Sequence, residues 1–398
     1  MLPTPATTPP RLPTLILLTA FSTLSLNMFL PSLGSIAADF RADYALVNVS
    51  IAGYLAVTSI LQLVIGPLSD RYGRRPVMLG AIVIFVFASL GCVLARDIWT
   101  FLAFRMVQGV IIAGAALSPA MIRDTAPERE AASLLGYVTM AMAMAPMLAP
   151  MLGGALDELF GWRASFVFFV ASGIAAFGLA WTDMGETNRS PSETFTKQFR
   201  DYPALFGSRR FWGYALSMSF SVGAFYCFLS GAPLVAQSAL AIKPAMLGFL
   251  LGTITAGFAF GSFLSGRYAA RFGLTAMMLA GRAVACGGLL LGLGLYWAGS
   301  VNLLSFFGTT IFVGLGNGLT VPSSNVGAMS VRPHLAGSAA GLAGAMTVGG
   351  GALLTSFTGW ALTPQNAIWA LLTIMLASSA AAGIAALSVL AIDRSEGR

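Results

Sequence analysis

The stretch GPLSDRYGRRPV, residues 66–77, carries four charged residues within six positions: Asp70, Arg71, Arg74 and Arg75. On both sides of it the chain is almost free of charge for about twenty residues, which is the length of a helix that crosses a bilayer. Gly73 and Pro76 favour a short turn between the two apolar segments. The stretch therefore predicts a pair of membrane-spanning helices joined by a charged turn at one membrane face.

The composition of the whole chain agrees with a membrane protein. Of its 398 residues 57% are hydrophobic and only 9% are charged, and the mean hydropathy is +0.81. Soluble proteins carry roughly 25% charged residues, so a water-facing surface is excluded. The net charge of +7 lies in short basic runs between apolar segments, and nucleic-acid binding would need a basic face. We therefore expect the lipid bilayer, and not nucleic acid, as the partner of the surface.

The three cysteines, Cys92, Cys227 and Cys286, lie far apart in apolar segments without C-x-x-C spacing. This pattern favours neither a disulfide nor a metal site. We expect no metal and no cofactor.

Apolar segments long enough to span a membrane recur along the chain. We predict twelve, with no alternation typical of an outer-membrane barrel, at 12–33, 45–68, 76–95, 98–121, 131–155, 162–181, 211–236, 244–265, 274–297, 302–328, 336–360 and 366–392.

The longest polar segment, 182–210, holds nine of the 37 charged residues and divides the predicted spans six and six. Two equal halves around a polar linker are typical of transporters built from repeats. We predict an all-α membrane protein with twelve transmembrane helices in two six-helix lobes, 1–181 and 211–398, joined by a cytoplasmic linker at 182–210.

The distribution of Lys and Arg predicts the orientation. With the N-terminus inside, four basic residues face outward and sixteen of the 22 face inward, in the sense of the positive-inside rule. The four outward residues are Arg41, Arg96, Arg163 and Lys243. We expect both termini in the cytoplasm.

The motif GPLSDRYGRRP resembles the loop between the second and third spans of the major facilitator superfamily, in the form of its drug:proton antiporters. With the preceding residues, QLVIGPLSDRYGRRPV (62–77) is similar to the Bcr/CflA branch of multidrug and chloramphenicol-type exporters. The resemblance extends over all twelve spans. It implies the major facilitator fold, transport by alternating access, and a multi-pass protein of the bacterial inner membrane.

The resemblance implies a latch at this loop in the outward-facing state. Asp70 would face the N-terminus of the span 336–360, near Gly337 and Ser338, and Arg74 would pair with Asp124. The candidate latch residues are Gly66, Asp70, Arg71, Gly73, Arg74, Arg75 and Asp124.

Two further motifs support the resemblance. FRMVQGVIIAGAA (104–116) is similar to the family's R-x-x-Q-G motif and implies a buried role for Arg105 in proton movement. GYVTMAMAMAPMLAPMLGG (136–154) is similar to the antiporter motif of exporters, although Ala149 replaces a usual Gly. Its matching or kink-forming residues are Pro146, Pro150, Gly153 and Gly154.

The resemblance implies that the first, fourth, seventh and tenth spans line a central cavity. Aromatic and Met side chains give a loose, apolar pocket that can repack around different ligands. The candidate substrate-binding residues are Asn27, Tyr54, Phe225, Tyr226 and Asn317.

Proton coupling is less clearly encoded, because Asn27 stands where related exporters have an acid. None of the fifteen acids falls at the centre of a predicted span; Asp157 and Glu158 are expected in an outer loop, and the single histidine, His334, in an inner loop. Three alternatives stay open: protons move through Asp39 or Asp124 with Arg105, solutes exchange without protons, or the protein is a facilitator.

The sequence thus predicts an exporter of small drug-like molecules, monomeric and without enzymatic activity, acting by proton antiport. The alternative is a metabolite exporter or a facilitator without proton coupling. Arg105 and Arg282, without nearby acids in the sequence, favour neutral or anionic substrates, for example phenicol-like compounds. A membrane enzyme would need a cluster of catalytic groups, which the spans lack.

Overall fold

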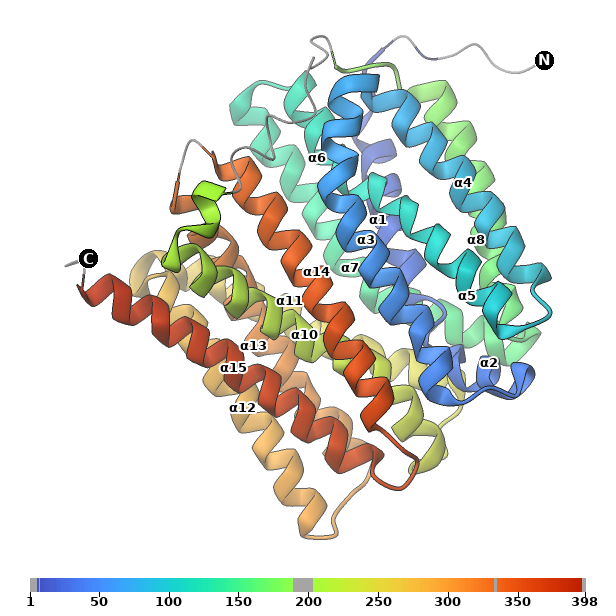
Figure 1. The fold of residues 1–398 in the computed structure, drawn as a ribbon, viewed down its shortest axis with the longest axis vertical. Helices are drawn as coiled ribbons and strands as arrows, with labels where there is room; N and C mark the ends of the chain where they lie inside the picture. The colour runs from blue at the N-terminus through green and yellow to red at the C-terminus, as the bar shows by residue number, and fades with distance from the viewer. Residues whose placement is uncertain (1–5, 7, 189–202, 333–334, 396–398) are drawn as a thin grey trace.

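The computed structural model describes residue 6 and residues 8–188, 203–332 and 335–395. Residues 189–202 of the linker segment 182–210, together with His334, lie outside this description. The described part of the chain consists of long helices that are joined by short connections (Figure 1).

The first half of the chain forms six long helical segments, two of which are interrupted by short 3-10 turns. The elements are α1 (Leu12–Asn27), η1 (Leu30–Ser32), α2 (Leu33–Phe40), α3 (Tyr44–Tyr72), α4 (Arg74–Leu94), α5 (Ile98–Val107), η2 (Gln108–Ile112), α6 (Ala113–Thr125), α7 (Glu128–Phe160) and α8 (Arg163–Asp183).

The second half forms six uninterrupted long helices. They are α10 (Arg209–Ser238), α11 (Pro244–Phe272), α12 (Leu274–Trp297), α13 (Leu303–Ser330), α14 (Ala336–Ala361) and α15 (Ala367–Ser395). Among the described residues, eleven of the twelve long segments are long and apolar enough to cross a membrane, and α7 is the remaining one. The predicted all-α class with twelve long helices is confirmed, and the chain is a multi-pass membrane protein.

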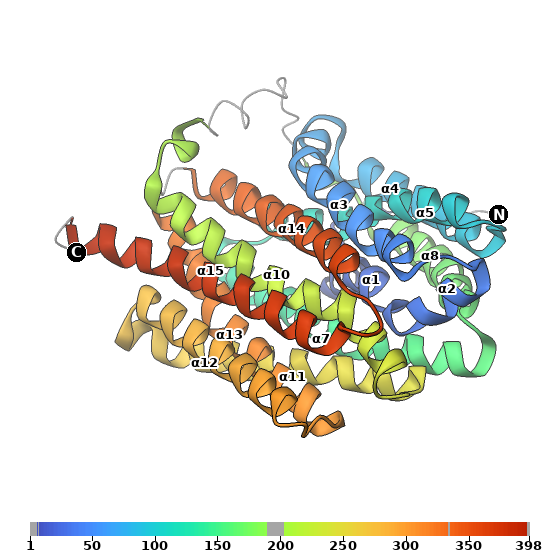
Figure 2. The same cartoon turned by 60° about the horizontal axis from the view of Figure 1, so that its bottom comes forward.

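The helices form two bundles, α1–α8 and α10–α15, that lie side by side (Figures 1 and 2). Between the bundles, α3 packs along α14 and α7 packs along α11. The exact limits 1–181 and 211–398 of the two lobes stay a prediction. Because successive long helices reverse direction, Gly73 and Arg41 mark opposite ends of the molecule, which we call the Gly73 end and the Arg41 end.

Two predicted limits are wrong at the Arg41 end. The first span continues through η1 and α2 to Phe40, because the turn at Pro31 redirects the helix without ending it. The fifth span continues to Phe160, where Gly161 adopts a positive φ of 80°. Asp39, Asp157 and Glu158 therefore lie in helices and not in loops.

Candidate functional site

The turn between α3 and α4 gathers a compact charged cluster at the Gly73 end. Gly73 has a φ of 97°, which suits glycine and ends α3 one residue before α4 begins. Arg74 then binds the carboxylates of Asp70, at 2.5 Å, and Asp124, at 3.1 Å, so that it links α3 to α6. The structure thus brings Asp70, Arg74 and Asp124, three of the seven candidate latch residues, together within one lobe.

The remaining residues of the predicted latch surround this cluster. Arg75 donates to the carbonyl of Trp181 and lies over its ring, Arg71 lies over Tyr72, and the carbonyl of Gly66 accepts from Ser69. A Cβ built at Gly337 would meet no atom within 4 Å, so open space surrounds this position at the start of α14. The contact of Asp70 with that helix stays a prediction for the outward-facing state.

Arg105 lies in the last turn of α5 and is fully buried. Its guanidinium donates to the side chain of Gln108, at 2.8 Å, and to the carbonyl of Ser25, at 3.0 Å. It lies 4.2 Å from the centres of two aromatic rings, those of Phe29 and Tyr54. No acidic residue of the described chain forms an ion pair with it, so aromatic faces and polar oxygens stabilise the cation.

Of the candidate substrate-binding residues, Tyr54 is the one whose ring lies on the Arg105 guanidinium. Asn27 is buried at the end of α1; its amide donates to Thr23, and its side-chain oxygen has no partner among the described residues. The hydroxyl of Tyr54 lies 3.3 Å from that of Ser25. Tyr226 belongs to α10 of the other lobe.

Phe225 adjoins Tyr226, and both side chains are half-buried. Tyr226 also lies against Gly351 of α14, where a Cβ would collide with the ring. The two lobes thus contribute Tyr54, whose ring lies on the Arg105 guanidinium, and Tyr226, which packs against Gly351 of α14.

Asn317 lies inside the second lobe and does not join this group. Its side-chain oxygen accepts from buried Arg282, at 2.9 Å, and Arg282 also donates to Thr320. Within the described chain one guanidinium nitrogen of Arg282 has no partner. The role of Asn317 in substrate binding stays a prediction. Arg282 is a second buried cation that forms no ion pair with an acid of the described chain.

The small residues of α7 pack directly against backbone. A Cβ at Gly153 would collide with the carbonyl of Met28, and one at Gly154 would collide with the carbonyl of Pro244. From the other side, a Cβ at Gly248 would collide with the carbonyl of Pro150. Gly154 and Gly248 therefore bring α7 into backbone contact with α11, across the boundary between the lobes, whereas Gly153 brings α7 against the end of α1 in its own lobe.

A polar network joins the lobes near the Arg41 end. Asn48 of α3 donates to the carbonyl of Thr355, at 2.8 Å, and accepts from the hydroxyl of Ser230, at 2.7 Å. Tyr44 donates to the carbonyl of Ser230, at 2.6 Å. Asn48 and Ser230 are buried. These bonds must break if the lobes separate at this end.

Replacing Asn48 with alanine is expected to favour separation at the Arg41 end, because it removes both hydrogen bonds from a buried position, each worth roughly 1 kcal/mol. Spin labels attached to cysteines at positions 46 and 362, across the two lobes, should report a larger population of long distances. An unchanged distance distribution would contradict a gating role for Asn48. Replacing Asn302, which caps α13 at an exposed turn, is the matched control.

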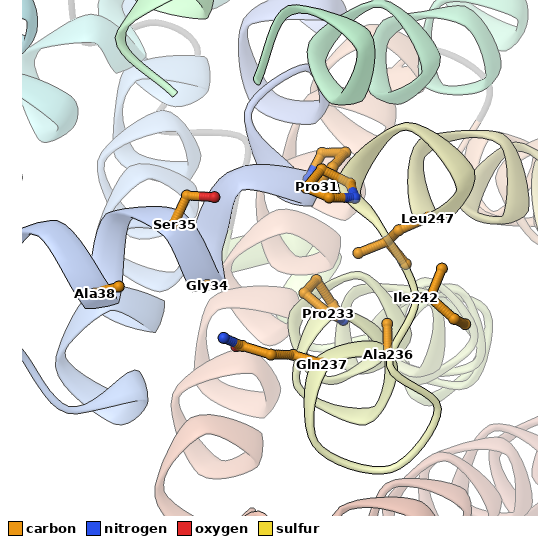
Figure 3. Close-up of a pocket in the computed structure, with 10 residues that line it drawn as sticks. Pro31, Gly34, Ser35, Ala38, Pro233, Ala236, Gln237, Ile242 and Leu247 are labelled. Atoms are coloured by element: carbon orange, nitrogen blue, oxygen red, sulfur yellow. The ribbon is translucent and has the colours of Figure 1, made fainter. Parts of the chain in front are cut away.

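A cavity of about 340 Å³ lies beside this network, between η1–α2 of one lobe and α10–α11 of the other (Figure 3). Its lining is apolar apart from Ser35 and Gln237. The other lining residues are Pro31, Gly34, Ala38, Pro233, Ala236, Ile242, Pro244 and Leu247. Gln237 reaches to Gly34, where a larger residue would collide with its amide.

The acids at the Arg41 end differ in their surroundings. Asp39 is exposed and binds Arg163, at 2.6 Å. Hydrogen bonds from Thr100 lower the pKa of Asp97, so Asp97 stays ionised. Asp157 is buried, alone among the acids whose side chains the structure describes, and it accepts a hydrogen bond of 2.8 Å from Ser35. The sequence offered no signal for the burial of Asp157, because the end of α7 could not be located from the residues.

Comparison with known proteins agrees with these features. The chain is 28% identical over 368 residues to a "Chloramphenicol resistance protein" of Pseudomonas aeruginosa, covering 89% of this chain and 85% of that protein. It is 29% identical over 370 residues to "Multidrug resistance protein D" of Escherichia coli, covering 91% of each. A third relative, "Uncharacterized MFS-type transporter YdgK" of Bacillus subtilis, is 35% identical over 252 residues, 62% of each chain.

Solved structures show the same fold at low sequence identity. A bacterial homolog of the lysosomal transporter Spinster, inward-facing and unoccupied, has a TM-score of 0.75 at 18% identity and covers 96% of both chains. A D-xylose-proton symporter has a TM-score of 0.74 at 17% identity, covering 95% of this chain and 96% of that one. The family model of the Major Facilitator Superfamily matches residues 15–356. With two six-helix bundles in contact through α3–α14 and α7–α11, the chain belongs to the Major Facilitator Superfamily.

Proposed function

We propose that this protein exports small drug-like molecules by alternating access and that export is coupled to proton antiport. Its similarity to chloramphenicol and multidrug resistance proteins covers about nine tenths of the chain. The structural observation that carries the proposal is the fully buried Arg105, whose guanidinium lies on the rings of Phe29 and Tyr54 and forms no ion pair with an acid of the described chain. This site presents aromatic surface and polar atoms, which suits ligands that combine both.

The charge of two buried arginines, Arg105 at this site and Arg282 inside the second lobe, favours neutral or anionic substrates. Arg105 and Arg282 are both buried without an acid in the described chain, and a lipophilic cation would be repelled at such positions. Neutral phenicol-like compounds combine aromatic rings with hydroxyl and amide groups, so we propose them as the first substrate class to test.

We further propose that the Gly73 end faces the cytoplasm and that the protein acts as a monomer in the bacterial inner membrane. The positive residues of the α3–α4 turn support this orientation. In the proposed cycle, the contacts of Asn48 and of Gly154 close the outer side in the state described here. Closure of the Gly73 end, with Asp70 against α14, would then open the outer side.

The test is transport by purified protein in proteoliposomes with an imposed pH gradient, using a phenicol, a lipophilic cation and a fluoroquinolone. Substrate-dependent proton movement would support antiport and contradict a facilitator. Substrate movement that ignores the gradient would contradict antiport and favour the uncoupled alternative. If none of these compounds moves, drug export is contradicted. Proteoliposomes that contain the Gly154→Leu variant are measured in parallel, and they report the passive leak of substrate through the protein.

Replacing Asp70 with asparagine is expected to lower transport about tenfold, the effect of roughly 1.4 kcal/mol on the rate-limiting step. The change removes the charge that binds Arg74 and that the latch would place at the N-terminus of α14. Efflux in proteoliposomes, at equal protein content, measures the result. Asp97→Asn at the opposite end is the matched control, and wild-type efflux by Asp70→Asn would exclude the latch.

A further inference from the structure

Three consecutive residues that follow α8, Glu186, Thr187 and Asn188, bind the charged cluster of the α3–α4 turn. We call these three residues the clasp. The hydroxyl of Thr187 donates to Asp124, at 3.2 Å, to the same oxygen that accepts from Arg74. The amide of Asn188 donates to the carbonyl of Asp70, at 2.7 Å. The clasp therefore touches each partner of Arg74.

Glu186 forms more hydrogen bonds than the other two residues of the clasp. One carboxylate oxygen accepts from the backbone N–H of Arg74, at 2.9 Å, and the other from that of Arg75, at 3.1 Å. The first oxygen also accepts from the N–H groups of Thr187 and Asn188, at 3.0 and 2.8 Å. A single carboxylate thus accepts hydrogen bonds from the first two N–H groups of α4 and from the N–H groups of the two residues that directly follow Glu186.

This position is favourable for a negative charge. The first N–H groups of a helix have no partner within the helix, and the helix dipole places partial positive charge there. α4 has no side-chain cap from its own N-cap residue, Gly73. A Cβ at Gly73 would collide with the Glu186 carboxylate, so glycine is needed here for space as well as for backbone conformation.

We propose that Glu186 is a positioning residue for transport: it caps α4 from outside and thereby holds Arg74 between Asp70 and Asp124. The inference rests on the proposed transport function and adds to it a role for the start of the linker. Arg74 is the first residue of α4, so its side-chain direction depends on the helical turn that Glu186 fixes. The clasp acts on the geometry of the cluster and touches no substrate site.

The test compares Glu186→Gln with Glu130→Gln, an exposed acid at the same end of the molecule. Glutamine keeps the size but removes the charge. We expect Glu186→Gln to lower the maximal efflux rate about fivefold, with the KM for substrate unchanged, because the helix dipole loses its anion. Combined with Arg74→Ala it should add no further loss. Glu130→Gln should match the wild type.

A second measurement does not depend on transport. Spin labels at Tyr72→Cys and Arg123→Cys, in a variant without the three native cysteines, report the position of the turn relative to α6. We expect Glu186→Gln to widen this distance distribution and Glu130→Gln to leave it unchanged. An unchanged distribution with Glu186→Gln, or losses that simply add to those of Arg74→Ala, would overturn the inference.

The two measurements separate the inference from the function on which it rests. If the wild type moves none of the tested compounds, drug export fails and the distance measurement still decides on the clasp. If the wild type transports and Glu186→Gln equals it in rate and in distances, the clasp alone fails.

Discussion

Replacing Arg105 with alanine is expected to reduce efflux about 100-fold, a loss of roughly 3 kcal/mol in the transport barrier. The guanidinium is fully buried and serves as donor to Gln108 and to the carbonyl of Ser25. Without it, each of these buried acceptors is left unpaired, at a cost of roughly 1–3 kcal/mol. The ring of Tyr54 also loses the cation that lies on its face.

Arg105→Lys distinguishes charge from geometry. Lysine keeps the positive charge but lacks the planar fork that reaches two acceptors at once, so we expect most of the loss to remain. Efflux in proteoliposomes at equal protein content measures both variants, and Arg96→Ala, an exposed arginine before α5, is the control. Full activity of Arg105→Lys would show that charge alone matters, and full activity of Arg105→Ala would exclude the site.

Replacing Gly154 with leucine is expected to reduce efflux about 30-fold, because overpacking a tight contact costs roughly 1–3 kcal/mol. The new side chain would meet the backbone of Pro244 and Ala245 in α11. Backbone does not move aside as a flexible side chain does, so the lobes cannot close at this point. The variant should therefore populate states in which the Arg41 end is open.

Gly178 in α8 provides the matched control for this substitution. It is also a glycine within a long helix, but a Cβ there meets nothing within 4 Å. Gly178→Leu should keep wild-type efflux, which excludes a general effect of glycine replacement. Wild-type efflux by Gly154→Leu would mean that α7 and α11 need not approach closely during transport.

Much of the fold could be predicted from the length and spacing of the apolar segments. Apolar segments of about twenty residues, separated by charged turns, determine the number of spans, because a bilayer core accepts only helices of that length. The same reasoning located the turn at Gly73. It failed at the ends of the first and fifth spans, where Asp39 and Asp157 continue helices, since helices can extend past the membrane core without an apolar signal.

Sequence motifs predicted some contacts near the charged turn, but they did not predict contacts between segments that are distant in the chain. Arg74 binds Asp124, the contact that the motif implies, and it also binds Asp70, for which the motif implies a contact with α14. Asn317 instead pairs with Arg282 inside its lobe, which spacing within one helix cannot reveal. Asn48, Ser230 and Glu186 were not identified, because each acts on a residue far away in the sequence.

The class of the protein, its membrane-spanning segments and the charged turn follow from the residues alone, since these depend on the solvation of short stretches of chain. The three-dimensional arrangement was needed to see which glycines touch backbone across the lobes, that Tyr54 lies on the Arg105 guanidinium, and that Glu186 caps α4. The physical reason is that such contacts depend on the packing of helices far apart in the chain, whose register no local pattern encodes.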